Sequence, residues 1–232
     1  MGPQWISEIW TISINVRLRL QTSRTATKIN VVENRFLRLQ ATILKRVLGL
    51  SEGWCVWVTG LPGSGKSVVA ETLIKFLLQK GIRAQLLSSD ALRKVLTPKP
   101  TYSFEERDVV YATLVYIAKL LTQNCVNVVI DATGNLRRYR ENARNQIQKF
   151  MEAYLECPLE VCIERESKRT ETHQAPKQIY KKALKGEAPT VPGIGQPYEP
   201  PKNPEVTINT AQCTPEQAAQ KILEAMLAKW YA

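Results

Sequence analysis

The sequence is poor in histidine and in long apolar runs, and each shortage excludes a class of protein. His173 is the only histidine among 232 residues, so we expect no histidine-based metal centre. No apolar stretch is long enough to span a membrane. The first twenty residues lack a charged leader, and Glu8 interrupts their apolar part. We therefore expect no secretory signal and a cytoplasmic location.

Cysteine is scarce too, and its arrangement argues against both a disulfide framework and a zinc site. The chain has five cysteines, an odd number, and none of them forms a Cys-x-x-Cys pair. Cys55, Cys125 and Cys162 stand within apolar runs. This pattern is typical of buried, reduced thiols in a cytosolic protein.

Positive charge is in excess, with a net charge of +11. Residues 1–50 hold eight Lys or Arg and two Glu, which accounts for +6 of this total. The remaining body is only mildly basic, which suits an enzyme of polyanionic small molecules. No long basic run is present, so we expect no nucleic-acid partner.

Residues 1–50 form a basic N-terminal extension with its own pattern. Apolar residues alternate over 12–20, as in a strand, and recur at near-helical spacing over 37–48. Two interpretations remain open. The extension is either a packing appendage or a docking element for a partner or a membrane surface.

From residue 51 to residue 232 the pattern becomes that of an α/β domain. We predict strands at 54–58, 82–87, 126–131, 150–156 and 205–210. Helices are expected at 68–81, 103–123, 136–150 and 158–166, with a last one after Thr214. Ser103 and Glu106 match a capping box, and Thr214 and Gln217 match another. Alternating strands and helices indicate a mostly parallel sheet covered on both faces.

Residues 165–204 break this alternation. Six of the thirteen prolines lie between Pro189 and Pro204. The segment is first charged and then rich in proline and glycine. We predict that it forms a lid over the site.

One motif predicts phosphate binding directly. The segment "VTGLPGSGKS" contains Gly-x-x-x-x-Gly-Lys-Ser between a predicted strand and a helix. Its glycines let backbone N–H groups approach phosphates, and the helix N-terminus adds positive charge. Lys66 reaches the transferred phosphate as a catalytic group, and Ser67 ligates Mg²⁺. The predicted ATP-binding residues are Gly60, Leu61, Pro62, Gly63, Ser64, Gly65, Lys66 and Ser67. The fold class is therefore that of the P-loop NTPases.

Two aspartates follow predicted strands, where ligands bind in parallel sheets. Asp90 could accept a proton from a hydroxyl or bind Mg²⁺ through water, or it could cap the helix that follows. Asp131 has a similar placement. Nearby arginines are individually typical of solvated surface charges, but together they would suit a second anionic substrate. They are Arg93, Arg107, Arg137 and Arg140.

Beyond this motif, the chain resembles the adenylylsulfate kinases over roughly residues 52–230. The resemblance rests on "VWVTGLPGSGKSVVAETL", "YSFEERD", "LECPLEVCIER", "IYKKALKGE" and "PGIGQPYEPPKNPEV". The last two are specific, because unrelated P-loop kinases do not usually carry them. The resemblance implies transfer of the ATP γ-phosphate to the 3′-hydroxyl of adenosine 5′-phosphosulfate, a step in sulfate assimilation. It also implies Mg²⁺ as cofactor, and a homodimer is a further candidate.

The same resemblance assigns the acceptor site. Asp90 matches an aspartate that acts as base or Mg²⁺-linked carboxylate. Arg93 and Arg107 match arginines that contact adenylylsulfate. Tyr102 stands where the family has phenylalanine, and Lys177 matches a lysine of the lid. We expect these residues and Asn135 to bind the acceptor.

Several positions depart from the family pattern, and most of them are on the acceptor side. Val110, Tyr111, Ala112 and Thr113 replace Asn-Ile-Arg-Arg. Thr133, Gly134 and Asn135 replace Ile-Ser-Pro, and Val191 replaces a lid phenylalanine. A segment near residues 169–176 looks inserted. Two alternatives therefore stay open: a kinase of the same fold acting on another hydroxyl, and a nucleotide-gated binding module that docks a partner through its N-terminus.

Overall fold

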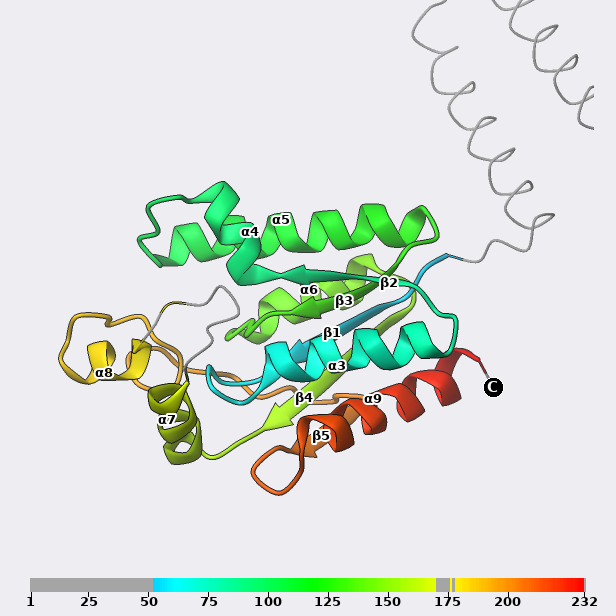
Figure 1. Cartoon of the computed structure of the whole chain (residues 1–232). Coiled ribbons are helices and arrows are strands. Elements are labelled where there is room, and N and C mark those ends of the chain that lie inside the picture. The colour runs from blue at the N-terminus through cyan, green and yellow to red at the C-terminus, as the bar shows by residue number, and fades with distance from the viewer. Residues whose placement is uncertain (1–51, 170–175, 177, 232) are drawn as a thin grey trace, which may run out of the picture. The chain divides into compact units, whose positions relative to one another are not determined.

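The described part of the chain folds around one parallel sheet, as the computed structural model shows (Figure 1). The structure describes residues 52–169, 176 and 178–231, which belong to the compact unit Glu52–Ala232. The predictions for residues 1–50 and for Lys177 lie outside the described residues. Within the described part, no helix has both the length and the apolar character needed to cross a membrane.

Five strands form the sheet, in the order β2-β3-β1-β4-β5, and every pair is parallel. The strands are β1 (Cys55–Thr59), β2 (Ala84–Ser88), β3 (Asn127–Asp131), β4 (Phe150–Glu156) and β5 (Val206–Asn209). All five lie where the sequence predicts a strand, within two residues at each end. The predicted α/β fold with a parallel sheet is therefore confirmed.

Successive residues of the central strands point to opposite faces of the sheet, and each face packs into its own apolar core. Val56, Val58 and Val129 point to one face, which is covered by α3 (Lys66–Gln79) and α9 (Pro215–Trp230). Trp57 and Ile130 point to the other, beneath α5 (Phe104–Gln123) and α6 (Arg137–Gln146). Because both faces are buried, the strands read as continuous apolar runs in the sequence.

Three more helices gather at the carboxyl ends of the strands (Figure 1). They are α4 (Ser89–Leu96), α7 (Leu159–Lys168) and α8 (Ile179–Leu184). Together α7, α8 and residues 188–194 form a small third core that includes Cys162, Tyr180 and Val191. The described part of the predicted lid is thus a packed structure with its own apolar centre.

Four local predictions need correction. Ser103 caps α5, but the Glu106 carboxylate does not complete the capping box, because it accepts from the Thr101 and Tyr102 backbone N–H groups instead. Ser88, not Asp90, caps α4, and its Oγ accepts from Ala91 N at 3.4 Å.

The helix predicted over 136–150 ends at Gln146, because Ile147 takes an extended conformation that leads the chain into β4. The fourth correction concerns the thiols. All five cysteines are free, but Cys125 is only half-buried. It occupies a turn with a φ of 64° before β3.

A chain of ion pairs fastens β4 and β5 to α6 and α9. Arg140 is almost fully buried and donates Nε to Glu152 at 2.5 Å. Glu205 receives Arg144 Nη1, Lys229 Nζ and the Glu152 backbone N–H, each at 2.7 Å. Burial alone would raise the pKa of Glu205, but these hydrogen bonds and the Arg144 charge lower it to about 2.

We predict that this cluster makes stability depend on acid pH. A carboxyl group with a lowered folded-state pKa stabilises the fold above its unfolded-state pKa, and this contribution is lost as the pH falls from about 4.5 toward 2. Glu205→Gln should therefore lower the free energy of unfolding by roughly 2 kcal/mol at pH 7. The difference from wild type should shrink below pH 4.5. Urea unfolding at several pH values measures both.

The matched control is Glu164→Gln, which removes an exposed ion pair to Lys168. It should change stability little at any pH, because solvent screens exposed charges. A Glu205→Gln penalty that is the same at pH 3 and pH 7 would contradict the assigned ionisation.

Candidate active site

The phosphate loop connects β1 to α3. Gly63 has a φ of 80°, and a Cβ there would lie 2.4 Å from the carbonyl oxygen of Cys162. Only glycine fits this close approach of the loop to α7. Tyr180 Oη of α8 donates to the Pro62 carbonyl at 2.8 Å. The loop is therefore held on one side by contacts with α7 and α8. Its other side lies at the edge of the sheet where the parallel strands end.

Lys66 is the first residue of α3, and its side chain is largely buried. Its Nζ donates to the Leu61 carbonyl across the loop at 2.9 Å. Burial lowers the pKa of Lys66, and the carboxylates of Asp131 and Asp90 act in the opposite direction. Both carboxylates are therefore near enough to act on the charge of Lys66, although Asp131 ends β3 and Asp90 follows β2.

The sheet register explains this convergence. Asp131 of β3 pairs with Val58 of β1 on one side and with Ser88 of β2 on the other. The ends of the three strands are level, so their following segments meet at one edge. Asp131 is 6% exposed, and burial raises its pKa, against the lowering effects of Lys66 and the Ser67 side chain.

Oxygen donors suitable for Mg²⁺ collect beside the loop. Ser67 and Asp131 are neighbours, and Asp90 faces the same cavity. Among the described residues, no group of three or more His, Cys, Asp or Glu could hold a metal by itself. This set fits Mg²⁺, which is usually bound by one or two carboxylates together with substrate phosphates.

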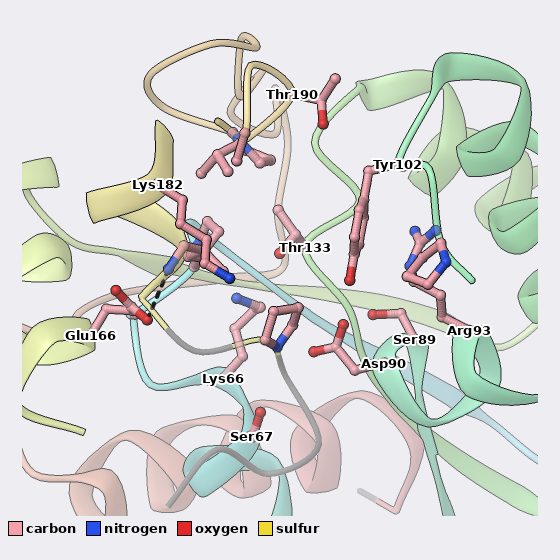
Figure 2. A pocket seen from close by; sticks show the side chains of 18 of the residues that line it. Lys66, Ser67, Ser89, Asp90, Arg93, Tyr102, Thr133, Glu166, Lys182 and Thr190 are labelled. Atoms are coloured by element: carbon pink, nitrogen blue, oxygen red, sulfur yellow. Dashed lines mark hydrogen bonds between the residues drawn. The ribbon is translucent and has the colours of Figure 1, made fainter. Parts of the chain in front are cut away.

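These groups line one cavity of about 780 Å³ (Figure 2). The phosphate loop forms its floor, α4 and the start of α5 form one wall, and α7, α8 and residues 187–192 form the other. Lining residues with polar or charged side chains include Lys66, Ser67, Ser89, Asp90, Arg93, Thr101, Tyr102, Arg107, Tyr111, Asp131, Thr133, Arg165, Glu166, Lys168, Arg169, Lys182, Glu187 and Thr190.

Arg93 and Tyr102 belong to the wall of the cavity that lies opposite α7 and α8. The Arg93 guanidinium forms an ion pair with Glu106 and lies 4.8 Å from the centroid of the Tyr102 ring. Tyr102 has a φ of 56°, a left-handed conformation unusual for a large residue. The Glu106 carboxylate holds this turn by accepting from Thr101 and Tyr102. In Figure 2 the hydroxyl end of Tyr102 points toward Asp90.

Two predicted acceptor residues have other surroundings. Asn135 is 1% exposed, does not line this cavity, and donates Nδ2 to the Pro197 carbonyl. Arg140 is not a surface charge, because it is buried against Glu152 and the Gly134 and Glu199 carbonyls. Arg137 donates to the Pro200 carbonyl. Of the four arginines considered from the sequence, Arg93 and Arg107 line the cavity.

The structure also explains why glycine stands at 134. A Cβ there would lie 2.9 Å from Trp57 Cζ2, and the φ is 49°. The Gly134 N–H donates to the hydroxyl of Tyr111 at 3.0 Å. Tyr111 itself is buried and stacks on Tyr139 at a centroid distance of 4.4 Å. An aromatic cluster thus holds the loop after β3.

Sequence reasoning did not single out most of the lid wall. Glu166 of α7 is 4% exposed and accepts the Ile179 N–H at 3.2 Å, which joins α7 to α8. Figure 2 shows Lys182 of α8 directed into the cavity. The only signal for Lys182 was its place in "IYKKALKGE". Arg165 likewise had only its place in "LECPLEVCIER", and Thr190 had none, because its position depends on how the lid packs.

Comparisons with known proteins agree with this geometry. The family model described as Adenylylsulphate kinase matches residues 52–209. A probable adenylyl-sulfate kinase of Pyrococcus abyssi is 37% identical over 172 residues, which cover 74% of this chain and 94% of the relative. The adenylyl-sulfate kinase of Halothermothrix orenii is 37% identical over 180 residues, with coverages of 78% and 92%.

Solved structures give the same result. The Mycobacterium tuberculosis APS kinase CysC in complex with AMPPNP and APS is 33% identical, with a TM-score of 0.68. The match covers 76% of this chain and 98% of that one. A sugar kinase from Janibacter, 20% identical with a TM-score of 0.55, shares the fold alone. From the family match and these relatives we conclude that the chain belongs to the adenylylsulfate kinase family.

Proposed function

We propose that the protein transfers the γ-phosphoryl group of ATP to the 3′-hydroxyl of adenosine 5′-phosphosulfate. The products are 3′-phosphoadenylylsulfate and ADP, and the reaction is a step in sulfate assimilation. One observation carries the proposal: a single cavity joins the phosphate loop to a wall built from Asp90, Arg93, Tyr102 and Arg107. A donor and an anionic acceptor can therefore meet inside it.

The donor side would hold ATP through the backbone N–H groups of residues 60–67 and through Lys66. Ser67 and Asp131 would hold Mg²⁺ together with the phosphates, and the ion would neutralise charge on the transferring group. Lys66 and both aspartates line the same cavity, and the two carboxylates act on the pKa of Lys66. Its ammonium group would contact the terminal phosphate.

On the acceptor side, Asp90 would take the proton. Ser88 caps α4, so the Asp90 carboxylate is not used as a cap and faces the cavity below Tyr102 (Figure 2). The bond from the γ-phosphorus to the β,γ-bridging oxygen breaks, and a bond to the 3′-oxygen forms. The 3′-hydroxyl proton passes to Asp90, and ADP leaves with the electron pair of the broken bond.

A second acceptor class stays open on a specific observation. At the positions where the family has Asn-Ile-Arg-Arg, Val110 is fully buried in the protein and Ala112 has no polar group. The wall therefore recognises anions through Arg93 and Arg107 without those contacts. A different phosphorylated or sulfated alcohol is accordingly the alternative acceptor.

Cytoplasmic location and a homodimer also remain predictions.

We predict acceptor-dependent release of ADP with adenylylsulfate. Purified protein with Mg·ATP should turn over rapidly with this acceptor, and Lys66→Ala should reduce kcat at least a hundredfold. A coupled assay for ADP across a panel of alcohol acceptors measures this. Turnover only with another alcohol would favour the second acceptor class. ATP binding without any acceptor dependence would instead favour the binding module and contradict both kinase proposals.

The two aspartates should differ in kinetic effect. Asp90→Asn should lower kcat by roughly 10²–10⁴-fold with little change in the KM for ATP, because it removes a proton acceptor. Asp131→Asn should instead weaken the apparent Mg²⁺ affinity by about 10–100-fold. Initial rates at varied Mg²⁺, ATP and acceptor separate the two effects.

Asp108→Asn makes the same chemical change outside the cavity, where Asp108 pairs with Arg138 on the surface. It should leave kcat, the KM for ATP and the apparent Mg²⁺ affinity near their wild-type values. An Asp90→Asn variant that keeps the wild-type kcat would exclude Asp90 as the base.

A further inference from the structure

The loop of residues 188–196, here called the lid loop, is braced by its own hydrogen bonds. The carbonyl oxygen of Val191 accepts from Gly195 N at 3.0 Å and from Gln196 N at 3.1 Å, and Gly193 N donates to the Gln196 carbonyl at 2.8 Å. Val191 is anchored in the third core with Cys162 and Tyr180. These bonds hold the loop in one internal shape, so a bond at its edge helps to fix the position of the whole loop.

That bond comes from Arg107 of α5. Nη2 of Arg107 donates to the carbonyl oxygen of Thr190 at 2.6 Å, across 83 residues of sequence. Nε of the same guanidinium donates to the Tyr102 carbonyl at 3.2 Å. Arg107 therefore joins the lid loop to the turn that carries Tyr102. It spans the cavity from one wall to the other.

Arg107 is 7% exposed, yet its charge has no carboxylate within ion-pair distance in the described part of the chain. Arg93, on the same wall, is neutralised by Glu106. A guanidinium has five N–H donors, and Arg107 uses two on carbonyls. The remaining three have no partner among the described residues, and Arg107 lines the cavity. A buried cation that lacks a counter-ion is stabilised when an anion accepts hydrogen bonds from its free N–H groups.

We propose that Arg107 is a positioning residue that latches the lid loop to the acceptor wall, and that an acceptor oxyanion on its remaining N–H groups tightens this latch. The second half rests on the proposed function; the latch itself does not. Closing the loop when the acceptor binds would exclude water from the γ-phosphate. Arg107 would thus couple acceptor binding to protection of ATP from hydrolysis.

The latch can be tested without any substrate. Hydrogen exchange of peptides covering the lid loop is compared between wild type, Arg107→Lys and Arg107→Gln, with α9 peptides as the internal reference for folding. Lysine keeps the charge but cannot span both carbonyls. We expect lid-loop exchange to rise by about tenfold in both variants, because a charge-assisted hydrogen bond is lost. The α9 peptides should stay at wild-type rates.

Thr190→Ala is the matched control, because the latch uses the backbone carbonyl and not the side chain. It should exchange like wild type. Unchanged lid-loop exchange in both Arg107 variants would overturn the latch. Faster exchange in Thr190→Ala equal to that in Arg107→Lys would overturn it too, since the whole loop would then be sensitive to any change.

A second measurement tests the coupling. Adenylylsulfate should slow lid-loop exchange in wild type but not in Arg107→Lys, and this variant should hydrolyse more ATP per phosphoryl transfer. Equal protection in both proteins would overturn the coupling. If wild type shows no turnover with adenylylsulfate while the substrate-free difference persists, the proposed function fails and the latch stands.

Discussion

The level ends of three parallel strands are the constraint on which the site depends. Because β3 pairs with β1 and β2 so that Asp131 is opposite Val58 and Ser88, the phosphate loop, Asp131 and the start of α4 meet at one edge. A slip of one residue in either pairing would turn Asp131 away from Lys66. Two buried apolar cores, one on each face, hold that register.

The charged residues of the cavity differ in whether a nearby charge of opposite sign balances them. The charges of Asp131 and Asp90 oppose that of Lys66, and Glu106 pairs with Arg93. Among the described residues, Arg107 bonds only to carbonyl oxygens. A site for two polyanionic substrates needs net positive charge that is held in place before they arrive, because preorganised groups cost nothing at the moment of reaction. The ion pair of Arg93 and the two hydrogen bonds of Arg107 provide that rigidity.

The acceptor side also shows how a family pattern can change without loss of the fold. Trp57 and Arg140 occupy the space that a side chain at 134 would need. Tyr111 turns its hydroxyl to the Gly134 N–H. These residues are interdependent, so the departures from the family at 111 and 134 are one rearrangement of the packing. Arg93, Tyr102 and Arg107 line the cavity with Tyr111.

Local patterns were enough to predict the strands, most helices and the phosphate loop, because each of these depends on residues that are neighbours in the chain. The Gly-x-x-x-x-Gly-Lys-Ser motif and the Thr214 capping box are such cases.

The predictions that needed correction depend on side-chain contacts. Asn135 and Arg140 bond to Pro197 and Glu199 in distant segments, and sequence spacing does not report distance through space. Glu106 has nearby partners, but the turn at Thr101 and Tyr102 offers its carboxylate backbone N–H groups in place of the helix cap. The sequence by itself was enough to predict a phosphate site at Lys66 and Ser67. Only the tertiary structure decided which arginines face the cavity and that Arg107 reaches Thr190, because these contacts exist only after α5 and the lid have packed on the sheet.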